Sequence, residues 1–466
     1  ALAALLHLLL RCHQHRNAYQ EVSHGPLFAP VTKLAAQVDA AEDLPRVFRQ
    51  AWSAAVCVPP RPVHLDLNGL MGEFVETGTT EEPPAALGAW AAPPHRPGAD
   101  AAEVAAAARA LLSAQRVAIV AGDAASLSGC GRELLALAEA LAAPVLTTLG
   151  ARGLVSTRHP LHMGVVGNYS APPANEILCG AELVLYVGCD TGDQVTHYWR
   201  VPKPGSVRVV QIDADALEFH RSYAAEATVQ ADPRAALAAL VAEIGRPDRD
   251  GAYITWAQGI MESWRVAIAP RLASDAVAID PARLAAEITR ALPADGILVA
   301  DTGYSGIWTG TLVEMEPGQA YLRAAGSLGW AFPASLGAKL AAPQRKVVCW
   351  SGDGALYYHL PELETARRRG IAVVLVVNNN SGFGQGWPNL LRQVGNRPQA
   401  AEQLLRFGPT NFAEVARSFG VHGIRVERPG EMAAALQRAL AMDAPVVVDV
   451  VTDIDCRAPA PWDPPG

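Results

Sequence analysis

Short runs of β-branched and other apolar residues alternate with longer Ala- and Leu-rich stretches along most of the chain. The short runs contain few polar residues, as expected for strands that are buried on both faces of a sheet. The longer stretches have the length and composition of helices. The alternation therefore predicts an α/β fold with parallel-sheet domains.

This alternation occurs in two blocks, at about 100–245 and 280–452. Each block also contains an Asp-Pro helix start, at Asp232 and Asp280, because Asp caps a helix and Pro suits its first turn. The expected strands are 116–122, 144–148, 182–189, 206–215, 296–301, 346–352, 371–377 and 444–451. The expected helices are 132–143, 232–244, 280–292, 333–341, 361–369, 411–419 and 429–440.

Two Pro-rich stretches, at 81–100 and 245–251, are typical of linkers. The piece before the first linker shows one clear strand and one helix, too little for a complete α/β domain. The predicted domains are a partial N-terminal domain 1–80, a linker 81–100, a central α/β domain 101–245, a linker 246–279 and a second α/β domain 280–466.

Polar residues follow two neighbouring strands of the second block. Asp353 lies in a Gly-Asp-Gly sequence after one strand, and Asn379 and Asn380 end the next. Ligands bind outside the carboxyl ends of strands in parallel α/β sheets. Carboxylate and carboxamide oxygens suit Mg²⁺ better than zinc, and Mg²⁺ commonly bridges phosphates. The expected ligand is therefore a metal-bridged diphosphate, helped by a helix that we expect to begin near Leu360.

Other interpretations of these residues remain open at this point. Gly-Asp-Gly alone is a common turn, but 24 residues and a strand–helix–strand unit separate it from Asn379 and Asn380. The sequence 382–386 after the second strand weakly matches a dinucleotide-binding loop, which would indicate a nicotinamide-dependent dehydrogenase. It lacks the third glycine of that fingerprint, so the metal–diphosphate site is favoured.

Embedded in this way, the motif resembles the diphosphate-binding motif of thiamine diphosphate-dependent enzymes. The wider chain resembles the group that contains acetolactate synthase, benzoylformate decarboxylase and glyoxylate carboligase. The segments that carry this resemblance are 19–38, 159–178, 209–215, 326–341 and 352–366. The resemblance implies that 1–80 is part of a pyrimidine-binding domain and that 280–466 binds the diphosphate and Mg²⁺.

The resemblance also implies roles for single residues. Mg²⁺ would be held by the side chains of Asp353 and Asn380 and by the carbonyl of Gly382. The implied cofactor contacts are Gly303, Tyr304, Ser305, Leu328, Gly352, Asp353, Gly354, Ala355, Asn380, Gly382 and Phe383. Two residues would act in catalysis: Leu328 beneath the bent cofactor, and Gln20 reaching the site of a neighbouring subunit. Ordinary packing of Leu328 and a solvated Gln20 are the alternatives.

The implied function is thiamine diphosphate- and Mg²⁺-dependent decarboxylation and carboligation of small 2-oxo acids, as in acetolactate synthase. A 2-oxo acid decarboxylase similar to benzoylformate decarboxylase is the alternative. FAD is a candidate second cofactor, because 147–167 resembles the flavin-contacting region, although 189–194 departs from the expected pattern. The family also implies a homodimer or homotetramer whose active site lies at the subunit interface.

One family feature is missing from the front of the chain. The glutamate that activates the cofactor ring precedes the matched stretch in this family, and nothing upstream of Gln20 is acidic. We therefore interpret the chain as an N-terminally truncated piece of a longer enzyme. A non-catalytic, cofactor-binding remnant is the alternative.

Composition narrows the remaining possibilities. The formal net charge is −8 without a basic stripe, so nucleic acid is not an expected partner. Uninterrupted apolar runs stay shorter than the eighteen residues of a membrane span, so no membrane association is expected. Seven scattered cysteines without a C-x-x-C pair indicate a reducing compartment, and we expect a cytoplasmic protein.

Overall fold

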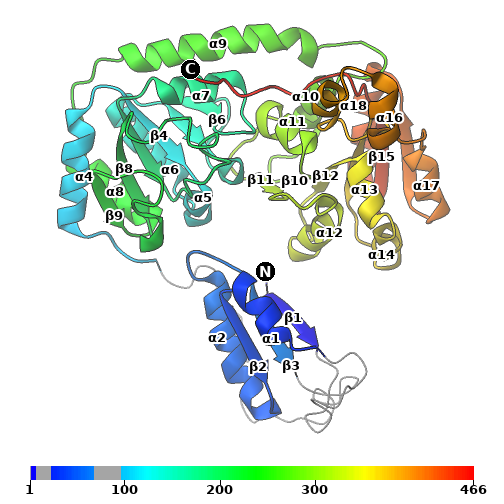
Figure 1. Cartoon of the computed structure of the whole chain (residues 1–466), viewed down its shortest axis with the longest axis horizontal. Coiled ribbons are helices and arrows are strands. Elements are labelled where there is room, and N and C mark those ends of the chain that lie inside the picture. Colours follow the sequence, from blue (N-terminus) through cyan, green and yellow to red (C-terminus); the bar gives the residue numbers. More distant parts are fainter. Residues whose placement is uncertain (1, 7–21, 68–95, 466) are drawn as a thin grey trace. The chain divides into compact units, whose positions relative to one another are not determined.

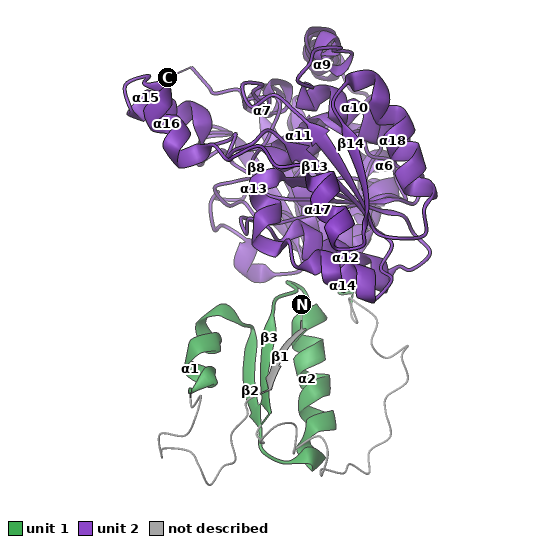
Figure 2. Cartoon of the chain, turned by 90° about the vertical axis from the view of Figure 1, so that its right-hand side faces the viewer, with its two compact units in different colours: residues 1–98 green, residues 99–466 purple. Residues whose placement is uncertain are grey.

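The computed structural model describes residues 2–6, 22–67 and 96–465 (Figure 1). The chain separates into two compact units, residues 1–98 and 99–466 (Figure 2). The predicted domains 101–245 and 280–466 thus fall within one compact unit, in which each has its own sheet. The finer domain boundaries stay a prediction.

Unit 1 contains a parallel sheet of three strands in the order β1-β3-β2. Its elements are β1 (Leu2–Leu6), α1 (His24–Phe28), β2 (Leu34–Val38), α2 (Leu44–Val56) and β3 (Val63–Leu67). One face of α2 carries Val47, Ala51 and Ala55, which pack on Val63 and Leu65 of β3. The sequence predicts α2 and β3 but misses the other two strands, because their Leu- and Ala-rich sequences contain a single β-branched residue, Val38.

The first sheet of unit 2 has the order β6-β5-β4-β7-β8-β9 and is parallel throughout. Its strands are β4 (Val117–Ala121), β5 (Val145–Thr147), β6 (His162–Val165), β7 (Leu183–Val187), β8 (Arg208–Asp213) and β9 (Ala227–Gln230). Consecutive residues of β4 belong to two different hydrophobic clusters, Ile119 to one and Val120 to the other. Helices therefore cover both faces, which explains the continuous apolar runs.

The second sheet of unit 2 has the order β11-β10-β12-β13-β15-β14 and is also parallel. Its strands are β10 (Ile297–Ala300), β11 (Ala320–Arg323), β12 (Val347–Gly352), β13 (Val374–Asn379), β14 (His422–Val426) and β15 (Val446–Val451). The predicted parallel α/β architecture is thus confirmed. The strands that the sequence misses, β6, β9, β11 and β14, lie at sheet edges, and each contains at least one polar residue that weakens the apolar signal.

The helices of unit 2 connect these strands. They are α4 (Ala101–Ser113), α5 (Asp123–Ser128), α6 (Gly131–Leu141), α7 (Pro172–Cys179), α8 (Pro233–Ile244), α9 (Ala252–Leu272), α10 (Pro281–Ala291), α11 (Tyr304–Leu312), α12 (Ala331–Ala341), α13 (Asp353–Leu356), α14 (Glu362–Arg368), α15 (Trp387–Gln393), α16 (Pro398–Leu405), α17 (Phe412–Ser418) and α18 (Met432–Ala441). Both predicted Asp-Pro caps are confirmed, since Asp232 and Asp280 accept main-chain N–H groups of α8 and α10. The expected linker 246–279 contains α9, which contacts α7 and α10 and so joins the two sheet regions (Figure 1).

The strand order of the second sheet creates a binding position. The chain leaves β10 for β11 on one side and then crosses to β12 on the other side. At such a switch point, neighbouring connections diverge and open a crevice at the carboxyl ends of the strands. The predicted metal-binding residues follow β12 and β13 at this edge.

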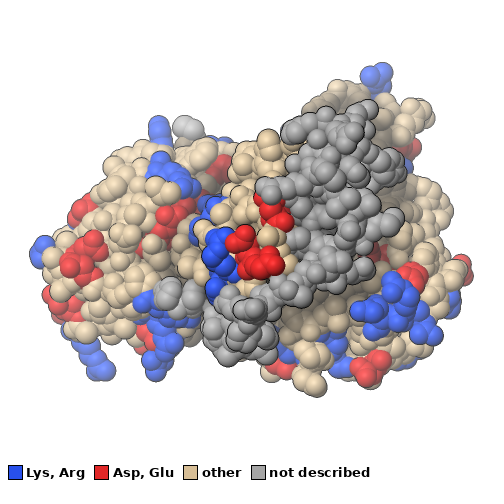
Figure 3. Space-filling view, turned by 90° about the horizontal axis from the view of Figure 1, so that it is seen from below, with Lys and Arg blue, Asp and Glu red and all other residues tan. Residues whose placement is uncertain are grey.

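The surface carries both charge signs. On the face shown in Figure 3, Lys and Arg side chains are interspersed with Asp and Glu side chains. The cysteines that the structure describes (57, 130, 179, 189, 349 and 456) are all free thiols. None of the helices in the described ranges combines the length and the apolarity that a bilayer span requires.

Candidate cofactor site

A cavity of about 390 Å³ lies at the switch point of the second sheet. Three chain segments form it: residues 302–305 after β10, residues 352–355 from the last residue of β12 onward, and residues 378–386 from the last two residues of β13 onward. Gly326 and Leu328 from the loop before α12 and Tyr169 from the first sheet region close it. Its size lies within the usual range for small-molecule sites.

Asp301 fixes the wall that carries Leu328. This carboxylate directly follows β10 and is fully buried. It accepts main-chain N–H groups from Gly329 and Ala331, both at 3.0 Å, and from Thr302 at 2.9 Å. The loop 326–331 is thereby tied to the end of β10, which holds the half-buried Leu328 on the cavity wall.

Asp353 forms the floor between β12 and β13. Its side chain is 2% exposed and accepts the N–H of Gly354 at 2.7 Å and of Gly382 at 3.1 Å. Burial raises the pKa of this carboxyl to about 6, although the main-chain donors favour its charged form. A cation in the cavity would favour the carboxylate further.

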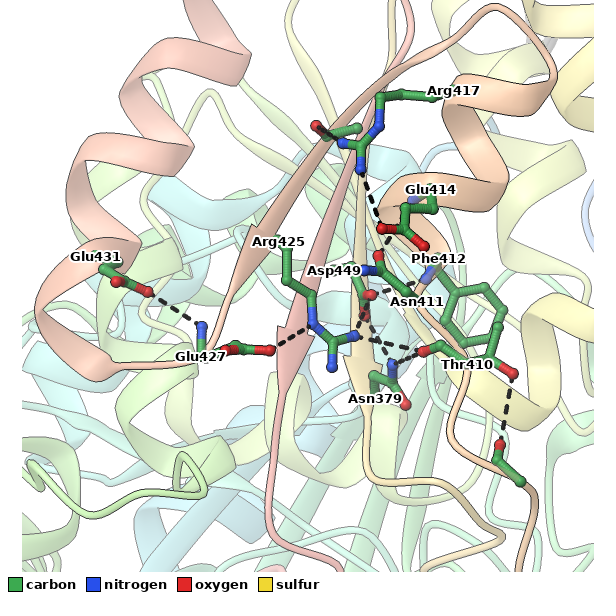
Figure 4. Close-up of polar contacts among 12 residues, drawn as sticks. Asn379, Thr410, Asn411, Phe412, Glu414, Arg417, Arg425, Glu427, Glu431 and Asp449 are labelled. Carbon is green, nitrogen blue, oxygen red and sulfur yellow. Dashed lines mark hydrogen bonds and ion pairs between the residues drawn. The ribbon is translucent and has the colours of Figure 1, made fainter.

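The three consecutive asparagines divide between two directions. Asn378 and Asn380 line the cavity, and each has a buried Oδ1 atom without a hydrogen-bond partner among the described residues. Asn379 instead donates its amide to the Asp449 carboxylate and to the Thr410 carbonyl, both at 2.8 Å (Figure 4). Side chains alternate along a strand, so residues two apart share one face. Two amide oxygens therefore remain available to a ligand.

Asp449 anchors the opposite face of β13. It is fully buried, accepts the N–H of Phe412 at 2.8 Å and forms an ion pair with Arg425 (Figure 4). Because every donor around it is engaged, this cluster is structural. It fixes the end of β13 and thus the position of the two neighbouring asparagines.

Two glycines keep the cavity open. A Cβ on Gly354 would lie 2.5 Å from Cε1 of Phe383, well inside contact distance. Gly303 has φ of 69°, and a Cβ there would meet Oε1 of Gln385 at 3.0 Å. Larger residues at these positions would be strained and would fill the space that a ligand needs.

The structure brings nearly all the predicted site residues together. The residues predicted from sequence that line the cavity are Gly303, Tyr304, Ser305, Leu328, Gly352, Asp353, Gly354, Ala355, Asn380, Gly382 and Phe383. Gln20 lies outside the described residues. The helix expected near Leu360 is α14, which begins at Glu362, and a separate short helix, α13, begins at Asp353 itself. The main-chain N–H of Gly354, one of the implied cofactor contacts, is donated to Asp353.

Sequence reasoning misses Tyr169, Thr302, Asn378 and Gln385, which also line the cavity. Strand alternation is a signal that could have found Asn378, because it lies two residues before Asn380. Tyr169 has no such signal, since it comes from the other sheet region.

Comparison with known families agrees with this geometry. Residues 301–450 match the family described as thiamine pyrophosphate enzyme, C-terminal TPP binding domain. Residues 104–240 match thiamine pyrophosphate enzyme, central domain. The first match spans the connections after β10, β12 and β13 that form the cavity.

Individual relatives extend over almost the whole chain. A probable acetolactate synthase large subunit of Methanocaldococcus jannaschii is 30% identical over 465 residues, which cover 97% of this chain and 76% of the relative. The corresponding protein of Methanococcus aeolicus is 28% identical, covering 94% and 74%. The acetolactate synthase isozyme 2 large subunit of Escherichia coli is 28% identical, covering 97% and 79%. The chain therefore belongs to the thiamine pyrophosphate-dependent enzymes and contains the central and C-terminal domains of that family.

Proposed function

We propose that the chain uses thiamine diphosphate and Mg²⁺ to decarboxylate a small 2-oxo acid and to join the remaining acyl unit to a second carbonyl compound. One observation supports the binding of Mg²⁺ and diphosphate. Asp353, Asn378 and Asn380 converge at the switch point, and both amides present buried oxygens without partners. The carboligation part is supported by the names of the relatives, which are acetolactate synthase large subunits.

The residues present fit the proposed cofactor. Asp353, Asn380 and the carbonyl of Gly382 would supply three hard oxygen ligands to Mg²⁺, leaving other positions to water and phosphate. Asp353 retains lone pairs on both oxygens, because each accepts one main-chain hydrogen bond. The two orphaned oxygens of Asn378 and Asn380 would gain a partner, which removes the cost of leaving them unsatisfied.

Bound thiamine diphosphate supplies a carbon nucleophile and an electron sink for loss of carbon dioxide from a 2-oxo acid. The chain's own residues would bind and orient the cofactor and the substrate. Leu328 would support the folded cofactor from the wall that Asp301 fixes. Phe383 and Tyr169 also line the cavity and would help to exclude water from it.

Several further features belong to the proposal. We propose a homodimer or homotetramer in which Gln20 of one subunit reaches the site of another, since Gln20 lies in the segment 19–38 that resembles the end of the family's pyrimidine-binding domain. FAD is proposed as a second cofactor bound by the central domain, testable by flavin absorbance of the purified protein. A cytoplasmic location is proposed from the scattered, unpaired cysteines.

Cofactor titration tests the site. Intrinsic fluorescence of the full chain should change saturably with thiamine diphosphate when Mg²⁺ is present and not when it is chelated. Asp353→Ala and Asn380→Ala should weaken this binding at least about tenfold, because each removes one metal ligand. Asp443→Ala, an exposed carboxylate before β15, is the matched control and should not change it. Equal affinity of all three variants would reject the metal site.

Product analysis tests the reaction. With pyruvate as substrate, a carboligase releases a hydroxy-ketone acid, whereas a simple decarboxylase releases acetaldehyde. Release of aldehyde alone would replace the carboligase with the decarboxylase alternative.

A further inference from the structure

A second cavity of about 290 Å³ lies apart from the cofactor cavity. The segment 152–165, the helix α9 and the residues 310–314 at the end of α11 form it. No residue of the described chain lines both cavities. The first turn of α11 contributes to the cofactor cavity and its last turn to this one, so the helix separates the two.

Arg152 is the unusual residue of this cavity. It is only 6% exposed, and no carboxylate of the described residues lies within ion-pair distance of its guanidinium. One terminal nitrogen donates to the Val313 carbonyl, and the group lies 5.4 Å from the ring centre of Tyr321. Its Nε is buried without a hydrogen-bond partner among the described residues. A buried cation without a counter-charge is costly unless a ligand supplies one.

The other ionisable groups around the cavity do not neutralise Arg152. Burial, and then the neighbouring Arg152, lower the pKa of His162 to about 3, so this imidazole is neutral at pH 7. Glu314 is the single acidic residue of the lining, and it forms an ion pair with Arg158 at 2.6 Å. Arg265 also lines the cavity, but its guanidinium lies 3.8 Å from the Glu262 carboxylate. Arg152 is therefore the positive charge of the lining that has no carboxylate partner among the described residues.

Apart from Thr157 and Thr311, the rest of the wall is mainly apolar. The side chains that form it are Met163, Val165, Met261, Trp264, Ile268 and Leu272. Inorganic phosphate would leave this surface uncovered, whereas an aliphatic or aromatic body would bury it. A carboxylate is planar and can accept two N–H groups from one guanidinium.

We propose that this cavity is a binding site for a small organic carboxylate with an apolar body, whose charge is received by Arg152. The site is independent of the cofactor cavity and does not depend on the reaction proposed above.

Calorimetric titration of the full chain with 4-methylpentanoate tests the site. This probe carries the expected charge and body but no 2-oxo group, so it cannot react in the cofactor cavity. We expect saturable binding of one molecule per chain at millimolar or lower concentration. The uncharged 4-methylpentanamide should not bind, and inorganic phosphate should bind more weakly than the carboxylate.

The affinities of variants test whether the probe binds in this cavity. Arg152→Met should weaken binding by roughly tenfold or more, the loss expected for a charged hydrogen bond. Trp264→Ala should also weaken it, and this half-buried position on α9 keeps the test valid if Arg152→Met does not fold. Arg208→Met, an arginine paired with Glu226 elsewhere in the same region, and Asp353→Ala should leave binding unchanged.

Three outcomes would overturn the proposal. They are the absence of saturable binding at millimolar carboxylate, unchanged affinity in both the Arg152→Met and the Trp264→Ala variants, and binding of phosphate in preference to the carboxylate.

Discussion

The buried carboxylate of Asp449 allows a quantitative test of what holds the cofactor edge together. Asp449→Ala removes the acceptor for Asn379, Phe412 and Arg425 at once. Breaking one side of a buried ion pair costs about 3–5 kcal/mol. The Arg425 side chain is 28% exposed, so water can solvate part of the charge that the variant leaves unpaired. We therefore expect the free energy of unfolding to fall by about 3 kcal/mol.

Urea denaturation followed by far-UV circular dichroism at pH 7 measures this loss. Glu427→Ala is the matched control, because Glu427 pairs with the same Arg425 at 3.2 Å but is 65% exposed. Exposed pairs contribute about 0–1 kcal/mol, so the two variants should differ clearly. If Asp449→Ala costs no more than Glu427→Ala, the buried cluster is not what fixes the end of β13.

Three further predictions concern other parts of unit 2. Burial raises the pKa of Asp213 to about 6, so the contribution of this carboxyl to stability should fall as pH rises from 4 to 6. Asp213→Asn lacks this titration, so its stability relative to wild type should rise by up to about 3 kcal/mol between acid and neutral pH in urea titrations, and an unchanged difference would contradict the shift. Leu328→Ala should lower kcat about tenfold while changing unfolding free energy by about 1 kcal/mol, and an unchanged kcat would leave Leu328 a packing residue. Gly354→Ala should weaken thiamine diphosphate binding in a fluorescence titration, because its Cβ would collide with Phe383, and wild-type affinity would contradict this.

Much of the fold could be predicted because buried parallel strands leave a strong apolar signal. The runs around Ile119, Val348 and Val376 are buried on both faces, and each was predicted as a strand. The missed strand Leu34–Val38 consists mainly of Leu, Ala and Gln, and it depends on packing against α2 rather than on its own preference. Contacts with distant parts of the chain therefore stabilise a strand that the local sequence does not predict.

The candidate site shows the same division. The positions of Asp353 and Asn380 follow from the carboxyl ends of neighbouring strands, which one sequence can reveal. The partner of Asn379 is Asp449, 70 residues away, and no local pattern indicates that pairing. The isolation of Arg152 is equally invisible in sequence, because the residues that contact it, Val313 and Tyr321, lie far from it along the chain.

The alternation of the three asparagines also limits how this chain can change in length. Residues may be gained or lost in the exposed turn before β13, where the sheet register can absorb them. A single insertion or deletion inside β13 would move every following side chain of the strand to the opposite face of the sheet. The amide that now anchors to Asp449 would then face the cavity, and the two open oxygens would face the core. The phase of β13, and not the number of residues between Gly-Asp-Gly and the asparagines, thus determines which amides face the cavity.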